Sequence, residues 1–220
     1  MEPPPSIPSD VAFSPAVKAL QSRNGSRRAY DRMEQRGGWA TTISDDLAAF
    51  IALQTSVFLA TANALGHPYI QHRGGPPGFL RVLDETTLGF ADLPGNRQFI
   101  TWGNLQENPK VCLFLIDYVQ RQRVKIWGEA RVVEGDAELL ARLAPTAQTR
   151  AERAIIIAVS TLDLNCPQYI PQRFEAEAMI AALADRDQRI ANLEGEVAEL
   201  RSNSRDDVQP PVTSRAEPTK

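Results

Sequence analysis

Apolar residues in the middle of the chain gather in short runs that are rich in β-branched and aromatic side chains and are separated by polar turns. Seven such runs occupy residues 56–62, 69–73, 79–83, 87–91, 111–119, 123–134 and 154–165. Runs of this length and composition are typical of β-strands. A short polar joint separates the fifth run from the sixth, which predicts a hairpin.

Two helical patterns interrupt this β-rich region. Residues 96–109 are expected to form a helix that ends at its proline, and residues 136–143 are expected to form another. There is no regular alternation of strand and helix along the chain. Six or seven short strands in this order predict a mainly β fold, an antiparallel barrel.

Helical segments also precede the barrel. Residues 14–36 predict two short helices that are broken near Asn24-Gly25. Ser44 is a suitable N-cap for a third helix, because two acidic residues follow it in the first turn. The Pro-rich start of the chain predicts no regular structure.

The C-terminal part, from residue 174 to residue 203, is rich in Ala, Glu, Leu and Arg and contains no proline. Its apolar residues fall on the a and d positions of a heptad pattern, and Arg186 occupies one charged d position; the apolar set is Met179, Leu183, Ile190, Leu193, Val197 and Leu200. About two clean heptads are too short for a stable isolated coiled coil. The pattern predicts a helix that packs against its own copy in a dimer or against the barrel.

Composition and charge narrow the class of protein. A chain of 220 residues suits one well-buried domain with extensions. The net charge of −3 argues against general affinity for nucleic acid. No apolar run approaches the ~20 residues that span a bilayer, and the first residues lack the features of a secretory signal. The two cysteines and two histidines, Cys112, Cys166, His67 and His72, form no zinc-binding spacing. We expect a cytoplasmic protein with reduced thiols and no structural metal.

Two clusters of Gly, Pro and Arg are the strongest candidates for chemistry. The first, at residues 71–81, contains three glycines that leave room for a flat ligand and two flanking arginines: Gly74, Gly75, Gly78, Arg73 and Arg81. The second, at residues 95–98, lies at the start of the predicted helix at residues 96–109, where free N–H groups and the helix dipole favour an anion. Its residues Asn96, Arg97 and Gln98 add side-chain donors.

The residues alone leave two interpretations of these clusters open. Converging in space, they would form a phosphate site, whereas an ordinary surface loop has the same composition. Neither a GxGxxG fingerprint after a strand nor a GxxxxGK[ST] loop is present. Rossmann and P-loop folds are therefore not expected.

The arrangement of residues 68–128 resembles the pyridoxamine 5′-phosphate oxidase-like family, the FMN-binding split barrels. Residues 68–92 are similar to the family's strand pair, and Leu-Pro-Gly-Asn-Arg-Gln at residues 93–98 is similar to its phosphate turn. Residues 107–133 resemble its Asn-Pro strand start and the strand that follows. The wider pattern over residues 14–173 is similar to a bacterial branch of flavin-nucleotide-binding relatives. The resemblance implies a split β-barrel of six or seven antiparallel strands with peripheral helices and a long C-terminal helix.

The resemblance also implies a set of cofactor-binding residues. The strand at residues 78–81 would meet the flavin and its phosphate, and the next strand, with Ala91 and Asp92, would contact the ring. The turn at residues 96–98 would hold the phosphate. Arg123 would reach the flavin from the strand on the partner side. The full set is Arg73, Gly74, Gly75, Gly78, Phe79, Leu80, Arg81, Ala91, Asp92, Asn96, Arg97, Gln98 and Arg123. Gln98 replaces a usual Lys and Arg123 a usual Gln. Arg73, Gly74 and Gly75 lie in a loop that does not align closely with the family.

The implied function is that of an FMN-dependent oxidoreductase, a homodimer with cofactor sites at the interface that acts on a small organic molecule. The named oxidase closes its substrate site with a C-terminal Trp and an Arg-Leu-His-x-Arg motif. This chain has no Trp after Trp127 and no His after His72. Pyridoxamine phosphate is therefore not the expected substrate. The alternative is a protein that binds flavin, deazaflavin or haem without turnover, and no catalytic residue is assigned.

With this resemblance, the chain is expected to divide into five segments. They are a disordered start (1–13), a helical arm (14–43), an FMN-binding split barrel (44–165), a loop with the C-terminal helix (166–203) and a disordered tail (204–220). Beside Arg73, His72 could act as an acid or base or contact the ring of a flavin, or it could simply be a hydrogen-bonded residue. Cys112 is expected to be a buried apolar residue, and Cys166 has no partner nearby in sequence.

Overall fold

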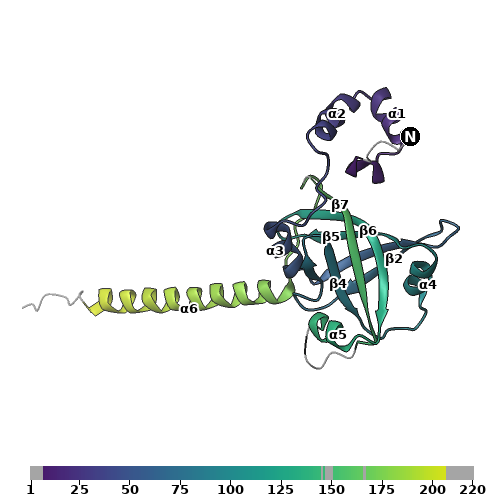
Figure 1. The fold of residues 1–220 in the computed structure, drawn as a ribbon. Coiled ribbons are helices and arrows are strands. Elements are labelled where there is room, and N and C mark those ends of the chain that lie inside the picture. Colours follow the sequence, from purple (N-terminus) through teal and green to yellow (C-terminus); the bar gives the residue numbers. More distant parts are fainter. Residues whose placement is uncertain (1–6, 145, 147–150, 166, 207–220) are drawn as a thin grey trace, which may run out of the picture. The chain divides into compact units, whose positions relative to one another are not determined.

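The computed structural model of the protein describes residues 7–144, 146, 151–165 and 167–206. A seven-stranded antiparallel sheet dominates it, with the strand order β2-β1-β5-β6-β7-β4-β3 and helices around its outside (Figure 1). The chain divides into two compact units, residues 1–172 and 173–220. The predicted mainly β, antiparallel fold with a long C-terminal helix is confirmed.

The strands follow the predicted runs closely. They are β1 (Ser56–Ala62), β2 (Pro68–Gly74), β3 (Arg81–Asp84), β4 (Thr87–Asp92), β5 (Lys110–Asp117), β6 (Gln122–Glu134) and β7 (Arg153–Asn165). Strands β5 and β6 form the predicted hairpin. Strand β3 begins two residues later than predicted, because Phe79 belongs to a turn in which its N–H donates to the carbonyl of Pro76.

The helices are the 3₁₀ helix η1 (Pro8–Val11) and the α-helices α1 (Pro15–Arg23), α2 (Arg27–Gln35), α3 (Asp45–Leu53), α4 (Ile100–Glu107), α5 (Ala137–Leu143) and α6 (Ala176–Asp206). The predicted break between α1 and α2 is present. The side chain of Ser44 accepts a hydrogen bond from the N–H of Leu47 and caps α3, as predicted. Asp136 caps α5 in the same way.

The start of α4 was predicted wrongly. The helix begins at Ile100, four residues after the predicted start at Asn96. Arg97 and Phe99 have φ angles of 58° and 54°, in the left-handed region that a right-handed helix excludes. Asn96 instead forms a local turn, because its Oδ1 accepts the N–H of Gln98 at 3.2 Å. Gly95 and Asn96 therefore do not lie at a helix N-terminus.

The core fills the inside of the barrel. Alternate residues of β1, β5 and β6 point inward, and the side chains of Leu59, Leu113 and Ile126 are fully buried there. Helix α3 adds Ile51 to the same cluster. Burial of each of these side chains contributes about 1.5–3 kcal/mol relative to exposure. The alternating residues on the other side of β1 and β5, such as Phe58 and Phe114, are half-buried on the outer face of the sheet.

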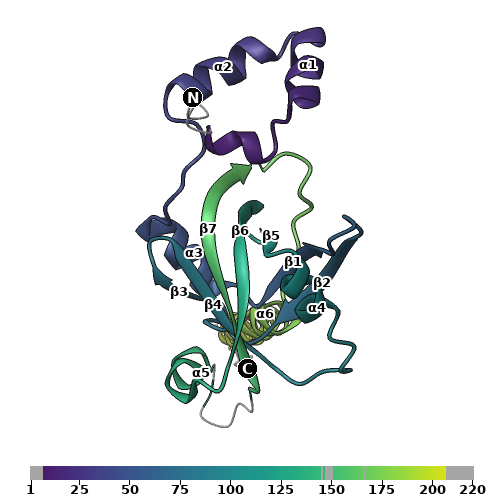
Figure 2. The same cartoon turned by 45° about the vertical axis from the view of Figure 1, so that its right-hand side comes forward.

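The N-terminal arm is attached to the end of the barrel around β7 (Figure 2). The indole rings of Trp39 and Trp127 stack with centroids 5.2 Å apart, and Phe13 packs against Trp39. Ala40 forms an isolated bridge with Leu162 of β7. Residues 7–13, within the segment expected to be disordered, include η1. Residues 1–6 and 207–220, at the two ends expected to be disordered, lie outside the described residues.

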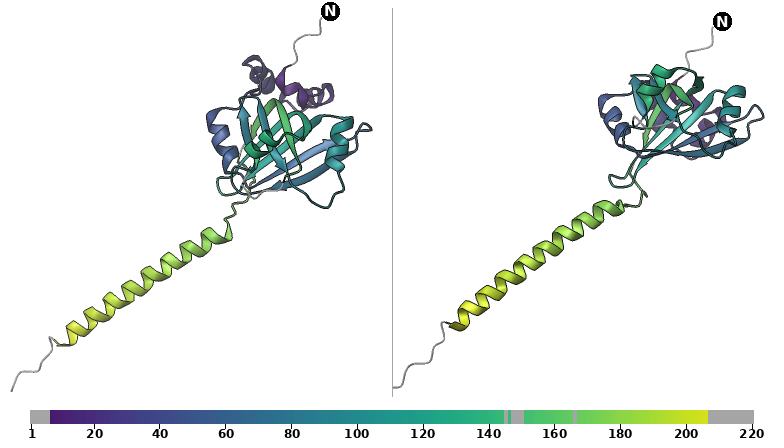
Figure 3. Two further views of the ribbon diagram at one scale, coloured as in Figure 1. Left: turned by 60° about the horizontal axis from the view of Figure 1, so that its bottom comes forward. Right: turned by 90° about the horizontal axis from the view of Figure 1, so that it is seen from below.

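The second unit consists mainly of α6, a helix of 31 residues (Figure 3). Its apolar a and d side chains are exposed. In the part of the chain that the structure describes, no helix combines the length and apolar character needed to cross a membrane.

We predict that Gly128→Ala destabilises the barrel. Gly128 lies at a bulge in the β6–β7 ladder, and an added Cβ would sit 2.2 Å from the carbonyl oxygen of Ala158. Backbone has to move to relieve this contact, so we expect the free energy of unfolding in urea to fall by roughly 2–4 kcal/mol. The matched control is Gly103→Ala in α4, where the added Cβ meets nothing within 4 Å and stability should rise by about 0.5–1 kcal/mol. A Gly128→Ala variant as stable as the parent would contradict the close approach of the two strands.

Candidate functional site

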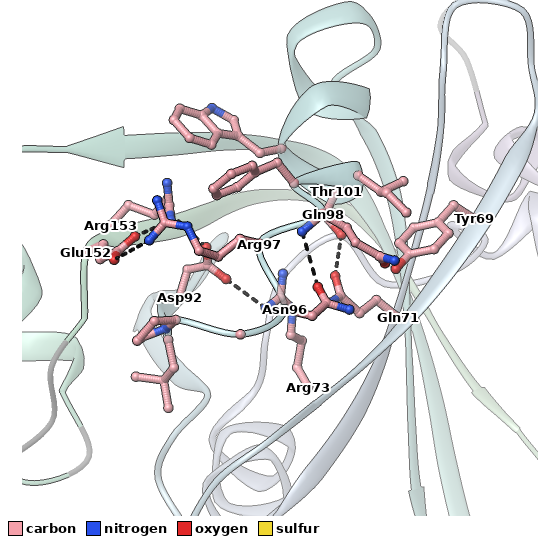
Figure 4. A pocket seen from close by; sticks show the side chains of 16 residues that line it. Tyr69, Gln71, Arg73, Asp92, Asn96, Arg97, Gln98, Thr101, Glu152 and Arg153 are labelled. Carbon is pink, nitrogen blue, oxygen red and sulfur yellow. Dashed lines mark hydrogen bonds and ion pairs between the residues drawn. The ribbon is translucent and has the colours of Figure 1, made fainter.

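A polar pocket of about 230 Å³ opens between β2, the β4–α4 loop, the first turn of α4 and the start of β7 (Figure 4). The polar side chains that line it are Tyr69, Gln71, Arg73, Asp92, Asn96, Arg97, Gln98, Thr101, Glu152 and Arg153. Three arginines and two carboxylates meet in this small volume. The pocket is therefore a candidate site for an anionic ligand.

Strand β2 contributes alternate residues to the pocket. Tyr69, Gln71 and Arg73 lie on one face of the strand, because successive side chains of a strand point to opposite sides. Gln71 is fixed by the hydroxyl of Thr101, which donates to its Oε1 at 2.6 Å. This hydrogen bond ties β2 to the first turn of α4.

Asp92 is the centre of the ion cluster. It forms ion pairs with two guanidinium groups: Nη1 of Arg73 lies 2.7 Å from one carboxylate oxygen, and Nε of Arg153 donates to the other at 2.9 Å. The side chains of Asp92 and Arg153 are only 14% and 7% exposed. Breaking a buried ion pair by removing one partner typically costs about 3–5 kcal/mol. Loss of Asp92 alone would therefore destabilise the protein, because it would leave the two guanidinium groups without their shared counter-charge.

The outer part of the cluster is more exposed. Nη2 of Arg153 contacts Glu152 at 2.6 Å, whereas Nη1 of Arg97 lies 3.7 Å from the same carboxylate. The side chain of Arg97 is 66% exposed. The three guanidinium groups outnumber the two carboxylates, so the pocket keeps a surplus of one positive charge on its open side.

Two aromatic rings support the arginines. The guanidinium carbon of Arg153 lies 4.5 Å from the ring centre of Trp102 and 5.4 Å from that of Phe99. Arg97 stands 5.4 Å from the Phe99 ring. Stacking of this kind restricts the guanidinium planes and leaves their N–H groups able to donate. The left-handed φ of Phe99 belongs to the turn that places its ring here.

Five of the predicted cofactor residues line this pocket together: Arg73, Asp92, Asn96, Arg97 and Gln98. The other eight do not line it. Phe79 and Leu80 are 5% and 1% exposed in the barrel core, and Arg81 is exposed on the edge strand β3. Ala91 precedes Asp92 on β4 and packs against the small cluster beneath α5.

Local packing and backbone conformation explain why glycines occupy three positions in residues 74–78. A Cβ on Gly75 would lie 2.6 Å from the Cβ of Phe79, so the loop closes on its own residues there. Gly78 has a φ of 84°, which L side chains rarely adopt. Gly74 lies against His72 and the carbonyl of Thr55. This packing accounts for the glycines without a ligand.

Arg123 lies on β6, paired in register with Ile116 of β5, and it does not reach the pocket. Its Nε is buried and has no hydrogen-bond partner among the described residues, and the same holds for the Nε of Arg73. A buried donor without an acceptor costs about 1–3 kcal/mol. Both atoms would be stabilised by an additional acceptor.

Sequence reasoning missed several residues of the pocket. Tyr69 could have been found, because it follows the period of two set by Gln71 and Arg73. The sequence around Glu152 and Arg153 contains no motif that would assign these two residues to a binding site. Arg153 reaches Asp92, 61 residues earlier, because the antiparallel β4–β7 ladder pairs these two residues directly.

The other candidate residues have ordinary surroundings. Nε2 of His72 lies 2.8 Å from the Ser56 hydroxyl, which supports the hydrogen-bonded interpretation. Burial raises the pKa of the Cys112 thiol, although Lys125 partly offsets this, so the thiol is not an activated nucleophile. Cys166 lies outside the described residues. Within the described ranges, no group of three or more His, Cys, Asp or Glu residues is arranged to hold a metal ion.

We predict that Asp92→Asn destabilises the protein by roughly 2–4 kcal/mol, because it removes the shared counter-charge of Arg73 and Arg153 at almost constant shape. The free energy of unfolding in urea measures this loss. Glu129→Gln, a matched change at an exposed position of β6, should alter stability by less than about 0.5 kcal/mol. Equal effects of the two variants would contradict the structural role of Asp92.

The family model described as Pyridoxamine 5′-phosphate oxidase matches residues 43–169, more than half of the chain. The solved structure of HupZ from Group A Streptococcus is similar with 19% identity over 60% of this chain and 99% of that one, at a TM-score of 0.48. An FMN-binding protein from Syntrophomonas wolfei has 12% identity over 66% and 97% of the two chains, at a TM-score of 0.43.

No curated protein sequence matches the chain. The family model alone covers the barrel from the residue before the Ser44 cap to beyond the end of β7. The resemblance found in the sequence is thereby confirmed, and the chain belongs to the pyridoxamine 5′-phosphate oxidase family.

Proposed function

We propose that this protein binds FMN and that the pocket between β2, β4 and β7 holds the phosphate. The observation that carries the proposal is the convergence of Arg73, Arg97 and Arg153 on one pocket with a surplus positive charge. Guanidinium groups match phosphate oxygens in both charge and geometry. Membership of the family supports the same ligand.

The residues of the pocket fit a phosphate group. Glu152 has a half-exposed side chain and occupies the outer nitrogens of Arg97 and Arg153, so a phosphate can replace it as their partner. Asp92 remains the inner counter-charge. The buried Nε of Arg73 gains a possible acceptor. Asn96 and Gln98 are exposed beside them and can donate through their amide groups.

The size of the pocket limits what it encloses. Pockets that take a whole drug-sized ligand measure about 300–1,000 Å³, and this one is smaller. We infer that it holds the phosphate end, while the flavin ring lies outside it, between two copies of the chain. The half-buried outer face of β1 and β5 and the unsatisfied Nε of Arg123 on β6 are in keeping with a homodimer whose cofactor sites lie at the interface.

Bound FMN supplies hydride and single-electron transfer, so the protein has to bind and orient it and needs no catalytic base. We propose a cytoplasmic FMN-dependent oxidoreductase whose domain at residues 44–165 holds the cofactor. Its substrate is a small organic molecule other than pyridoxamine phosphate. No residue of this chain is assigned to the substrate.

We predict that the purified protein shows a flavin absorption spectrum, or acquires one on addition of FMN, and releases FMN on denaturation. A protein whose spectrum and fluorescence do not respond to added FMN would contradict the proposal. A Soret band would identify haem, and a deazaflavin spectrum would identify that cofactor, as the ligand instead. Oxidation of NAD(P)H by the FMN-loaded protein with an electron acceptor then separates an enzyme from a protein that only binds FMN.

We predict that Arg97→Ala weakens FMN binding about tenfold or more, because one charge-assisted hydrogen bond to phosphate is lost. Titration with FMN measures this change. Riboflavin, which lacks the phosphate, should bind the variant and the parent equally. Arg131→Ala, at an exposed position of β6, is the matched control and should leave FMN affinity unchanged.

The variant Arg81→Ala tests whether the FMN phosphate binds in the pocket or near Arg81, where the resemblance in the sequence placed it. Arg81 lies outside the pocket, so its removal should have a much smaller effect than Arg97→Ala. A selective loss of FMN over riboflavin in Arg81→Ala, with normal binding in Arg97→Ala, would place the phosphate at β3 and refute the proposed pocket.

A further inference from the structure

Helix α6 exposes an apolar stripe that is interrupted at one position, Arg186. The side chains of Met179, Leu183, Ile190, Leu193 and Val197 are all 42–46% exposed. An amphipathic helix with such a stripe is stabilised in water when a partner covers it. We propose that α6 pairs with α6 of a second copy as a parallel, in-register, two-stranded coiled coil.

The identity of the core residues favours this form of pairing. With Leu193 and Leu200 at d, the a positions are Ile190 and Val197. β-branched residues at a with leucine at d favour parallel dimers over larger assemblies, because the side chains meet there at different angles. Leu183 extends the a row by one heptad toward the N-terminus.

The charged residues beside the stripe indicate that the partner of α6 is a second copy of the same helix. In a parallel dimer, a g residue faces the e residue five positions later on the other helix. Arg189 at g then faces Glu194, and Glu196 at g faces Arg201. Both pairs have opposite charges, and symmetry doubles each of them. The charged residues along the two edges of the stripe are therefore complementary to those of a second copy of the helix.

Arg186 interrupts the core at a d position. Its side chain is 64% exposed and contacts Asp187 at 3.3 Å. Two copies of Arg186 would lie next to each other in the dimer, so the tightly packed part begins at Ile190. A charged core position of this kind costs stability and disfavours shifted registers. The remaining coil is short, and association of the barrels would strengthen it by raising the local concentration of the helices.

The pairing of α6 does not depend on the cofactor. It follows from residues 183–201 alone, and it would stand if FMN did not bind. A protein that binds FMN as a dimer through its barrels alone would satisfy the proposed function and refute this inference.

Disulfide trapping in the full chain tests the geometry. In a background with Cys112→Ala and Cys166→Ala, Leu193→Cys places a thiol at d, and Gln188→Cys places one at f on the opposite side of the helix. Mild oxidation should give at least about tenfold more disulfide-linked dimer from Leu193→Cys than from Gln188→Cys. Equal yields, or no dimer from Leu193→Cys, would overturn the parallel in-register pairing. Circular dichroism of each variant verifies that it remains folded.

A charge exchange tests the partner without changing the core. Arg189→Glu and Glu194→Arg, each combined with Leu193→Cys in the same background, turn two attractive contacts of the homodimer into repulsive ones. Mixing the two variants restores attraction in the mixed dimer. The mixed disulfide should then clearly exceed the roughly half of the product that random pairing gives. A random distribution would overturn the proposed contacts between g and e positions.

Discussion

The carboxylate of Asp92, held between Arg73 and Arg153, is the interaction on which the arrangement of the site depends. Strands β2 and β4 are not neighbours in the sheet, since β1, β5, β6 and β7 lie between them. The ion pair of Arg73 with Asp92 nevertheless joins these two strands directly. Because the cluster is largely buried, its electrostatic attraction is stronger than that of a surface pair. The same contact fixes the positions of two arginines at the pocket.

This arrangement separates the structural charge from the charge available to a ligand. Asp92 is the buried inner partner of two arginines, whereas Glu152 is half-exposed and can give way to a ligand. An anion that enters the pocket can therefore exchange with Glu152 and leave the ion pairs of Asp92 intact. The proposed phosphate site and the stability of the barrel thus share residues without competing for the same contact.

Both proposals bring two copies of the chain together, through different surfaces. In the barrel, the pocket is too small to enclose a flavin ring, so in the proposed complex a second copy supplies residues that contact the ring. In the other unit, α6 carries an apolar stripe flanked by charged residues that pair with residues of opposite charge on a second copy. Two weak contacts linked in one chain bind much more tightly than either alone, because the second forms within the molecule.

The sequence by itself determined the strands, the β5–β6 hairpin, the cap of α3 and the heptads of α6, because alternation of burial and local hydrogen bonds are properties of short segments. It also indicated the turn at residues 95–98, although it placed the start of α4 too early, since the left-handed φ of Arg97 and Phe99 has no clear sequence signal. Only the tertiary structure decided that Arg73, Arg97 and Arg153 converge. Asp92 and Arg153 lie 61 residues apart, and the register of the β4–β7 ladder, a cooperative property of the whole barrel, brings them together.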